Sequence, residues 1–170
     1  YNLTTITLNA AYCGVPQSRR RHFIIGERDT SNTEKLLNYF STHRSRSPMT
    51  VRDYMPDINT EFYYRHPRSF ARRAIFSIDE PSPTIRGTDR PIAPNYKFHK
   101  KDAIQDMQKV RTLTLFERAK IQTFDDSYNW GDTNKTNLNQ MIGNAVPPNL
   151  AKFVAGGMIN CIGISALGGV

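Results

Sequence analysis

The chain has 170 residues, enough for one ordinary domain or two small ones, and 38% of them are hydrophobic. Its 23 lysines and arginines outnumber 15 acidic residues, and the net charge of +8 favours an anionic partner, nucleic acid first. Two cysteines without a pairing pattern argue against a disulfide-built secreted protein, and they form no zinc-ligand spacing with the four histidines. We therefore expect no metal site and a cytoplasmic or nucleoid-associated protein.

The first part of the chain predicts two strands. In residues 1–11, Ile6, Leu8 and Ala10 alternate with threonine and asparagine, a pattern typical of a half-buried strand. Residues 23–25, Phe-Ile-Ile, form a short apolar run that ends at a glycine and predict a buried strand.

Three arginines lead into the second strand. Alternation places Arg19 and Arg21 on one face and Arg20 on the other. Two guanidiniums side by side at the start of a strand can hold an anion or a group rich in hydrogen-bond acceptors. The alternative is a solvated basic strand end, and charge pattern does not decide between the two.

Residues 27–54 are mostly polar and predict short helices. One helix follows Thr33, with Leu36, Leu37 and Phe40 available for burial, and another begins after Thr50 as its cap. Between them lies a basic loop, His-Arg-Ser-Arg, which contains Arg44 and Arg46. It could contact phosphates, but a solvated loop is the simpler interpretation.

Residues 61–76 interleave aromatic rings with cations, including Arg72 and Arg73. This composition fits nucleic acid, because cations contact phosphates while rings stack on bases. It also fits a small core covered by arginine stems. Prolines then predict an extended approach to Thr84 and Arg86 in the segment Glu-Pro-Ser-Pro-Thr-Ile-Arg-Gly.

The last third of the chain predicts two helices. Thr114 and Glu117 form a capping box that starts a helix near Leu115, ending near Thr123. Residues 125–139, rich in Asp, Asn, Thr and Gly, predict a flexible connection. Two prolines open a final helix with an apolar stripe at three- and four-residue spacing: Leu150, Phe153, Val154, Gly157, Met158 and Cys161.

The end of the chain is uncharged from Phe153 to Val170, a length at which a membrane span has to be considered. Five glycines, Asn160 and Ser165 dilute its hydrophobicity, and Lys152 alone flanks it. We therefore expect a docking helix and no membrane partner.

Three blocks, which begin at Gly14, Arg111 and Gln140, resemble the cytosine-C5 DNA methyltransferase family. The first is Gly14-Val-Pro-Gln17-x-Arg19-x-Arg21, similar to the family's Gln-x-Arg-x-Arg motif. The second is Arg111-x-Leu-Thr-x-x-Glu117 followed by Gln122-x-Phe. The third is Gln140-x-x-Gly143-Asn-Ala-Val-Pro-Pro. The family's glycine-rich cofactor loop, Pro-Cys nucleophile and Glu-Asn-Val segment are absent, so the chain resembles the carboxy-terminal half of such an enzyme.

The resemblance implies family chemistry on a cytosine swung out of duplex DNA. A cysteine thiolate adds to C6, a glutamate holds N3, C5 takes the methyl group of S-adenosylmethionine, and a base then removes the C5 proton. Thiolate and glutamate would come from an amino-terminal half or subunit. By the same resemblance, Arg21 would donate to the O2 edge of the cytosine, Arg19 would hold a phosphate or brace the nucleophile loop, and Gln17 would position the loop.

Further site residues follow from the same resemblance. Asn144, Ala145 and Val146 would border the S-adenosylmethionine pocket, with Asn144 nearest. The Thr84 hydroxyl would reach a backbone phosphate at the flipped base, and Arg86 beside it would contact a base or phosphate. The remaining DNA contacts expected from the basic segments are Arg44, Arg46, Arg72 and Arg73. Cys13 lies in Tyr12-Cys13-Gly14, where the family more often has Asp-Tyr-Gly, and we expect it to be a packing residue.

The expected fold class is α/β, the carboxy-terminal part of a Rossmann-like methyltransferase lobe with a small, irregular, partly β recognition domain. The predicted units are strands at 1–28, a target-recognition domain at 29–110, a capped helix and hinge at 111–139, and a helix returning to the catalytic lobe at 140–170. The two ends should therefore lie close together.

Three functions remain open from the sequence. The first is the recognition-bearing part of a cytosine-C5 methyltransferase acting on duplex DNA. The second is a non-catalytic DNA-binding module derived from such an enzyme, and the third is an unrelated basic RNA-binding protein. Retention of Gln17, Arg19 and Arg21 favours the first, since a pure binder needs no contact to a flipped base. The DNA target sequence is not determined.

Overall fold

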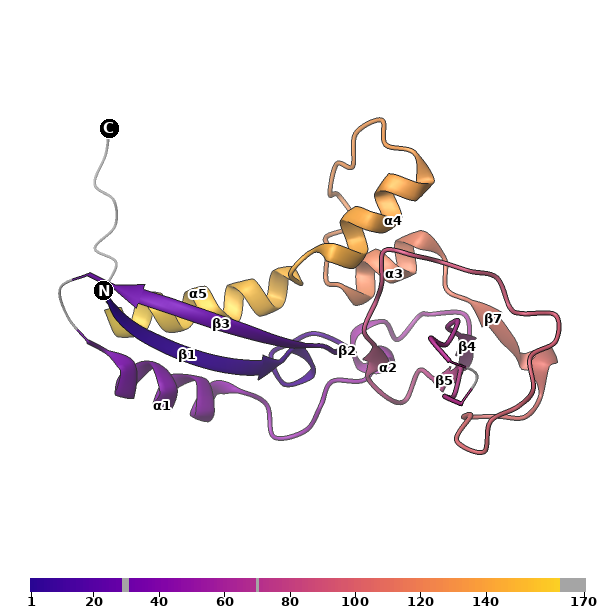
Figure 1. The fold of residues 1–170 in the computed structure, drawn as a ribbon, viewed down its shortest axis with the longest axis horizontal. Coiled ribbons are helices and arrows are strands. Elements are labelled where there is room, and N and C mark those ends of the chain that lie inside the picture. Colours follow the sequence, from indigo (N-terminus) through magenta and orange to yellow (C-terminus); the bar gives the residue numbers. More distant parts are fainter. Residues whose placement is uncertain (29–30, 70, 163–170) are drawn as a thin grey trace.

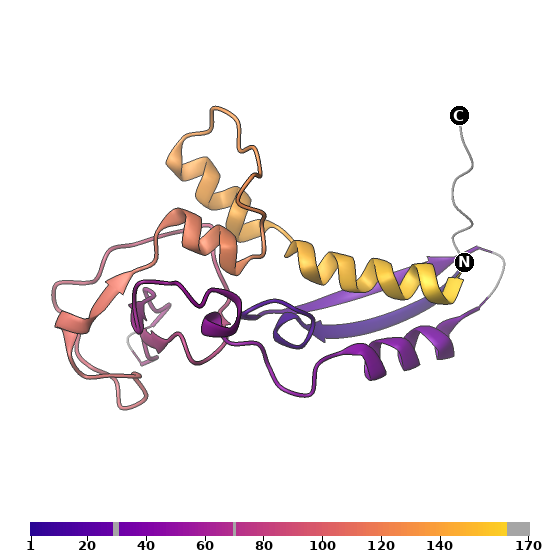
Figure 2. The same ribbon diagram turned by 180° about the vertical axis from the view of Figure 1, so that it is seen from behind.

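The structure, a computed structural model, describes residues 1–28, 31–69 and 71–162. It has two ends. The strands β1 (Asn2–Asn9) and β3 (Arg20–Glu27) lie at one end with the helices α1 (Thr33–His43) and α5 (Pro148–Ile162). The other end holds the remaining helices and short strands (Figure 1). Viewed from behind, α5 again runs along the strand pair, and the far end of α5 lies near Tyr1 (Figure 2).

The first core joins segments from both ends of the sequence. β1 and β3 pair antiparallel, with Leu8 opposite Arg21 and Thr4 opposite Ile25. Helices α1 and α5 share this core with the strand pair, and their rings meet with Phe40 and Phe153 centroids 5.8 Å apart. The apolar stripe predicted for the final helix faces this core, and Leu150 is fully buried.

One predicted feature of this core was wrong. The run at residues 23–25 is a half-buried strand, because Ile24 is 64% exposed while Ile25 is buried. Among the described residues, helices cover one face of the two-stranded sheet, so alternate side chains of β3 remain outside. Leu3 and Tyr1 are exposed beside Ile24 on this outer face.

Apart from β1, β3 and α1, the chain before α3 is irregular and partly β. It contains η1 (Ala10–Tyr12), β2 (Gln17–Ser18), α2 (Val51–Tyr54), β4 (Phe62–Tyr64), β5 (Ile75–Ser77), β6 (Ser82–Pro83), η2 (Met107–Lys109) and β7 (Val110–Thr112). Strand β4 lies between β5, antiparallel, and β7, parallel. The two-residue strands β2 and β6 pair in parallel, so the arginine motif lies beside the Pro-Ser-Pro-Thr segment.

Two helices complete the second end. Helix α3 (Leu115–Ile121) begins at the predicted capping box, which is formed by Thr114 and Glu117. Helix α4 (Lys135–Asn144) lies where part of the flexible connection at 125–139 was expected, so that prediction was wrong over its last five residues. Asn134 caps α4 by accepting the N–H of Asn137, and Leu138 and Ile142 are buried one turn apart.

Three aromatic rings of the segment 61–76 form core. Tyr63, Tyr64 and Phe76 are buried, and the Arg73 guanidinium lies 4.3 Å from the centroid of the Phe76 ring. The predicted boundary at residue 29 falls among the residues that the structure leaves undescribed, but α1, assigned to the recognition domain, packs in the first core. The four-unit division stays a prediction.

Residues 163–170, part of the uncharged window, lie outside the described residues. Within the described ranges, no helix has both the length and the apolar character needed to cross a membrane.

Candidate functional site

The arginine motif lies where the two ends of the molecule meet, and Gln17 is at its centre. Gln17 is fully buried. Its side-chain oxygen accepts the N–H of Ile85 at 2.9 Å, and its Nε2 donates to Oε1 of Gln122 at 2.7 Å. Gln122 in turn donates to the carbonyl of Ile142. One side chain therefore joins β2 to the segment after β6 and, through Gln122, to α4.

Arg19 holds the same segment from two residues further on. Its guanidinium donates to the carbonyls of Ile85 at 3.1 Å, Gly143 at 3.0 Å and Ala145 at 3.1 Å. The side chain is 2% exposed. Burial and the nearby charge of Arg21 lower the pKa of Arg19 to about 10. Both terminal nitrogens bind protein carbonyls, so in this structure Arg19 joins three segments rather than presenting its charge to a phosphate.

Arg21 has a different environment. Its side chain is half-buried on the face of β3 that pairs with Leu8. Its Nη1 donates to the carbonyl of Arg20 at 2.8 Å, and it forms no other hydrogen bond or ion pair within the described residues. The remaining donors of Arg21 are thus available to a group outside the chain.

The segment held by Gln17 and Arg19 contains two predicted DNA contacts. The Thr84 hydroxyl donates to the carbonyl of Ser18 at 3.0 Å, and the Arg86 guanidinium donates to the carbonyl of His66. In this structure the Thr84 proton is therefore used within the protein. The phosphate contact of Thr84 stays a prediction.

Two glycines allow this segment to approach α4 closely. A Cβ on Gly143 would lie 2.0 Å from the backbone nitrogen of Gly87 and 2.2 Å from the carbonyl carbon of Arg86. Since neither backbone can move aside like a side chain, only glycine fits at this crossing. The close approach brings the carbonyl of Gly143 within reach of Arg19.

The predicted cofactor residues form the connection between α4 and α5. Asn144 and Val146 are exposed, and the amide of Asn144 donates to Gln140 at 3.3 Å. Neither of two large hollows of the molecule includes Asn144, Ala145 or Val146. The connection presents an amide and an apolar side chain outward, next to the carbonyl of Ala145 that Arg19 binds.

The other predicted DNA contacts differ in availability. Arg44 and Arg46 are exposed in the loop that follows α1, and Arg72 is exposed before β5. Arg73 forms a two-pronged ion pair with Glu80. That pairing leaves Arg73 less available to DNA than the other three.

Two important residues were missed by the sequence interpretation. Arg118 of α3 is 5% exposed and donates to the carbonyl of Arg86 and to Asn139. Gln122 was noted only as part of a motif, without its pairing to Gln17. Arg118 follows Leu115 by three residues and precedes Gln122 by four, so helical spacing could have placed them on one inward face.

Cys13 behaves as a packing residue. It lies in the first core, and its Sγ donates to the carbonyl of Asn9 at 3.6 Å. Burial, only partly offset by the charge of Arg44, raises the pKa of Cys13 to about 11. The thiol is therefore protonated and enclosed near neutral pH. No cluster of three or more His, Cys, Asp or Glu side chains in the described parts of the chain could hold a metal ion.

The model of the C-5 cytosine-specific DNA methylase family matches residues 1–160. The chain belongs to this family. Two curated relatives are type II methyltransferases. M.HindV of Haemophilus influenzae is 54% identical over 162 residues, 94% of this chain and 53% of the relative. M.HgiDI of Herpetosiphon aurantiacus is 49% identical over 156 residues, 91% of this chain and 50% of the relative.

The chain spans about half the length of the curated relatives it matches. Among solved structures, the Dnmt2 methyltransferase of S. pombe aligns over 95% of this chain and 58% of that protein, with a TM-score of 0.54 and 11% identity. At this identity the likeness concerns the fold. The fold class expected from the sequence, the carboxy-terminal part of an α/β methyltransferase, is confirmed.

Proposed function

We propose that this chain is the carboxy-terminal, recognition-bearing part of a DNA (cytosine-5-)-methyltransferase. It acts on duplex DNA together with an amino-terminal part that brings the nucleophilic cysteine. The observation that carries the proposal is that residues of one motif have different environments. Gln17 and Arg19 are buried against protein, whereas Arg21, two residues further on in β3, keeps free donors.

Arg21 is the residue of this chain that touches the reacting base. Attack on the cytosine ring builds negative charge on the base, and a guanidinium donating to O2 stabilises that charge. Gln17 and Arg19 act as positioning residues: together they fix the N–H and the carbonyl of Ile85, and so the segment that follows Thr84. The base must leave the helix first, at a cost of a few kcal/mol.

The connection between α4 and α5 suits one wall of a cofactor site. The exposed Val146 offers an apolar surface, and the exposed amide of Asn144 can bond a polar edge of a ligand. S-adenosylmethionine, when bound, supplies an electrophilic methyl group. Asn144, Ala145 and Val146 would hold it together with residues of the amino-terminal part.

The outer face of the strand pair supports an amino-terminal partner. Tyr1, Leu3 and Ile24 are 87%, 63% and 64% exposed on one face of a two-stranded sheet. An apolar sheet face of this kind is normally covered by another element. Because the chain spans about half of its relatives, their other half is the natural cover.

Reconstitution tests the proposal. The chain is mixed with the amino-terminal part of the Haemophilus relative, and transfer of labelled methyl groups to duplex DNA is measured. We expect transfer only when both parts are present. Arg21→Ala should lower the rate about 100-fold to 1,000-fold, with DNA affinity almost unchanged, because the lost contact forms with the reacting base.

Lys35→Ala is the control, since Lys35 is an exposed cation on α1, outside the arginine motif and outside the exposed face of the strand pair. It should leave the rate almost unchanged. An equal fall in rate and affinity for Arg21→Ala would reduce Arg21 to a phosphate contact. If the pair binds DNA but transfers no methyl group, the chain is a non-catalytic binding module instead.

A further inference from the structure

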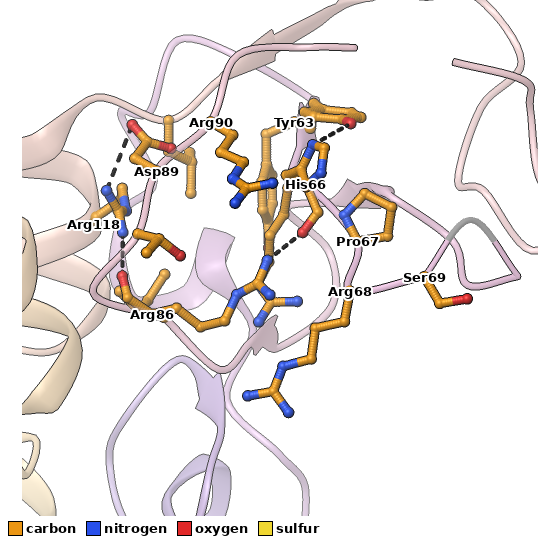
Figure 3. Close-up of a pocket in the computed structure, with 14 residues that line it drawn as sticks. Tyr63, His66, Pro67, Arg68, Ser69, Arg86, Asp89, Arg90 and Arg118 are labelled. Carbon is orange, nitrogen blue, oxygen red and sulfur yellow. Dashed lines mark hydrogen bonds and ion pairs between the residues drawn. The ribbon is translucent and has the colours of Figure 1, made fainter. Parts of the chain in front are cut away.

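A hollow of about 580 Å³ lies in the middle of the chain, between β4 and the loop after Ile85. Five arginines and a single acidic residue, Asp89, line it, together with His66. We call it the arginine pocket; its arginines are Arg65, Arg68, Arg86, Arg90 and Arg118. Figure 3 shows Arg86 and Arg90 reaching into the hollow from one loop, with Arg68 at its edge.

Three of these arginines form the floor of the pocket. Arg65 donates to the carbonyl of Thr84 at 2.6 Å, Arg86 donates to that of His66, and Arg118 donates to that of Arg86. A backbone carbonyl accepts a hydrogen bond from a guanidinium but does not neutralise its positive charge. Arg118 alone also lies near a carboxylate, 3.5 Å from Asp89. Burial and mutual repulsion lower the pKa of Arg65, to about 10, and of Arg86.

Two exposed arginines form the rim. Arg68 and Arg90 make no hydrogen bond or ion pair within the described residues. Their charges affect Arg86 and His66. Burial is the larger cause of the lowered pKa of Arg86, and Arg68 and Arg90 lower it further; Arg90 likewise adds to the effect of burial on the pKa of His66. The positive charge of the pocket is thus only partly neutralised by the protein. A bound anion would neutralise it and reduce the repulsion between the arginines.

A second hollow of about 790 Å³ continues from the first and shares Arg65, Pro67, Arg68 and Arg86 with it. It adds four further cations, Arg72, Arg73, Lys100 and Lys101, and reaches Ser18 and Thr84 beside the arginine motif. No acidic side chain lines it among the residues that the structure describes. A continuous basic track of this kind suits a polyanion that follows it, rather than one small anion.

We propose that the arginine pocket binds a backbone phosphate of the DNA strand. Arg68 and Arg90 donate from the rim and Arg86 from the floor. The proposal rests on the proposed function for the identity of the polyanion. It joins the contact expected of Arg86 with Arg68 and Arg90, which were not among the predicted site residues. Because phosphates carry no sequence information, this site fixes the position of the recognition region on DNA without selecting a base.

The test is the salt dependence of DNA binding by the 170-residue chain. Affinity for several unrelated duplexes is measured by fluorescence anisotropy between about 50 and 200 mM salt for the wild type, Arg68→Ala, Arg90→Ala and Arg68→Lys. Each alanine variant should weaken binding to every duplex by a similar factor. It should also reduce the slope of log affinity against log salt by about 0.9. Arg68→Lys should keep the wild-type slope.

Lys35→Ala is the matched control, because Lys35 is an exposed cation on α1 in the other half of the molecule. It should leave the slope unchanged. Melting curves show that each variant is folded, which the exposure of Arg68 and Arg90 leads us to expect. A competition arm compares inorganic phosphate with chloride at equal ionic strength, and phosphate should not displace DNA appreciably better.

Several results would overturn the proposal. These are an unchanged slope in the alanine variants, a loss confined to one duplex sequence (a base contact), displacement of DNA by inorganic phosphate at low concentration, or no DNA binding by the wild type. The experiment measures DNA affinity and does not depend on methyl transfer. A failed reconstitution with altered salt slopes would therefore contradict the proposed enzyme and leave the phosphate site standing.

Discussion

The guanidinium of Arg19 donates to the carbonyl oxygen of Ile85 at 3.1 Å, across 66 positions of sequence. Gln17 accepts the N–H of that same residue at 2.9 Å. Both the N–H and the carbonyl of Ile85 are thus held by side chains two positions apart in the arginine motif. This double contact ties the segment after β6 to the end of the molecule that carries β1, β3 and α5.

Arg19 is expected to be structurally irreplaceable. Arg19→Ala leaves the carbonyls of Ile85, Gly143 and Ala145 without their donor and should lower the free energy of unfolding by at least about 3 kcal/mol. Arg19→Lys should recover only part of this, because an ammonium lacks the planar fork that spans separate acceptors. Urea unfolding followed by circular dichroism measures both. Full recovery by lysine would mean that charge alone matters there.

Gly143→Ala should disrupt the crossing of α4 with the recognition segment. The new Cβ would meet the backbone of Gly87 at 2.0 Å, so we expect a loss of about 3 kcal/mol or more in thermal or urea unfolding. Gly156→Ala in α5 is the control, since its Cβ would meet only the hydroxyl end of Tyr39 at 3.0 Å. That variant should stay within about 1 kcal/mol of the wild type. Equal effects would refute the close approach.

Glu117 should contribute stability that disappears in acid. Burial raises its pKa, but hydrogen bonds from Arg111 and Thr114 outweigh burial, and the net shift is downward from 4.5. A lowered folded-state pKa means that the stabilisation is complete above the unfolded pKa and is lost as pH falls through the folded one. Glu117→Gln should therefore cost about 1 to 3 kcal/mol at pH 7 and progressively less below pH 4.5.

The matched control for Glu117 is Glu34→Gln, an exposed acid in the first turn of α1. It should change the unfolding free energy little at either pH. A Glu117→Gln penalty that stays constant from pH 7 to pH 3 would show that the carboxylate charge is not what stabilises α3.

Cys13→Ala should leave methyl transfer in the reconstituted pair almost unchanged, because a buried thiol with its pKa raised to about 11 presents no thiolate. The same property predicts slow labelling of Cys13 by a thiol reagent at pH 8 in the folded chain and fast labelling after unfolding. Loss of transfer in a variant that remains folded would assign Cys13 a part in the chemistry.

Local patterns in the sequence predicted the elements that depend on neighbouring residues. The capping box at Thr114 and Glu117, the strand alternation through Leu8, and the apolar stripe of the final helix through Leu150 all appear in the structure. Each results from short-range geometry: a cap three residues from its partner, or side chains that repeat with the period of a strand or helix. Three ordered motifs also sufficed to indicate the family, which the comparison confirms.

The tertiary structure alone decided what each motif residue contacts. Sequence alternation puts Arg19 and Arg21 on one face, but it does not reveal that the first is buried against three carbonyls while the second keeps free donors. The arginine pocket likewise joins side chains from β4, the loop after Ile85 and α3. Such contacts depend on how distant segments cross, and no periodicity within a short stretch encodes that crossing.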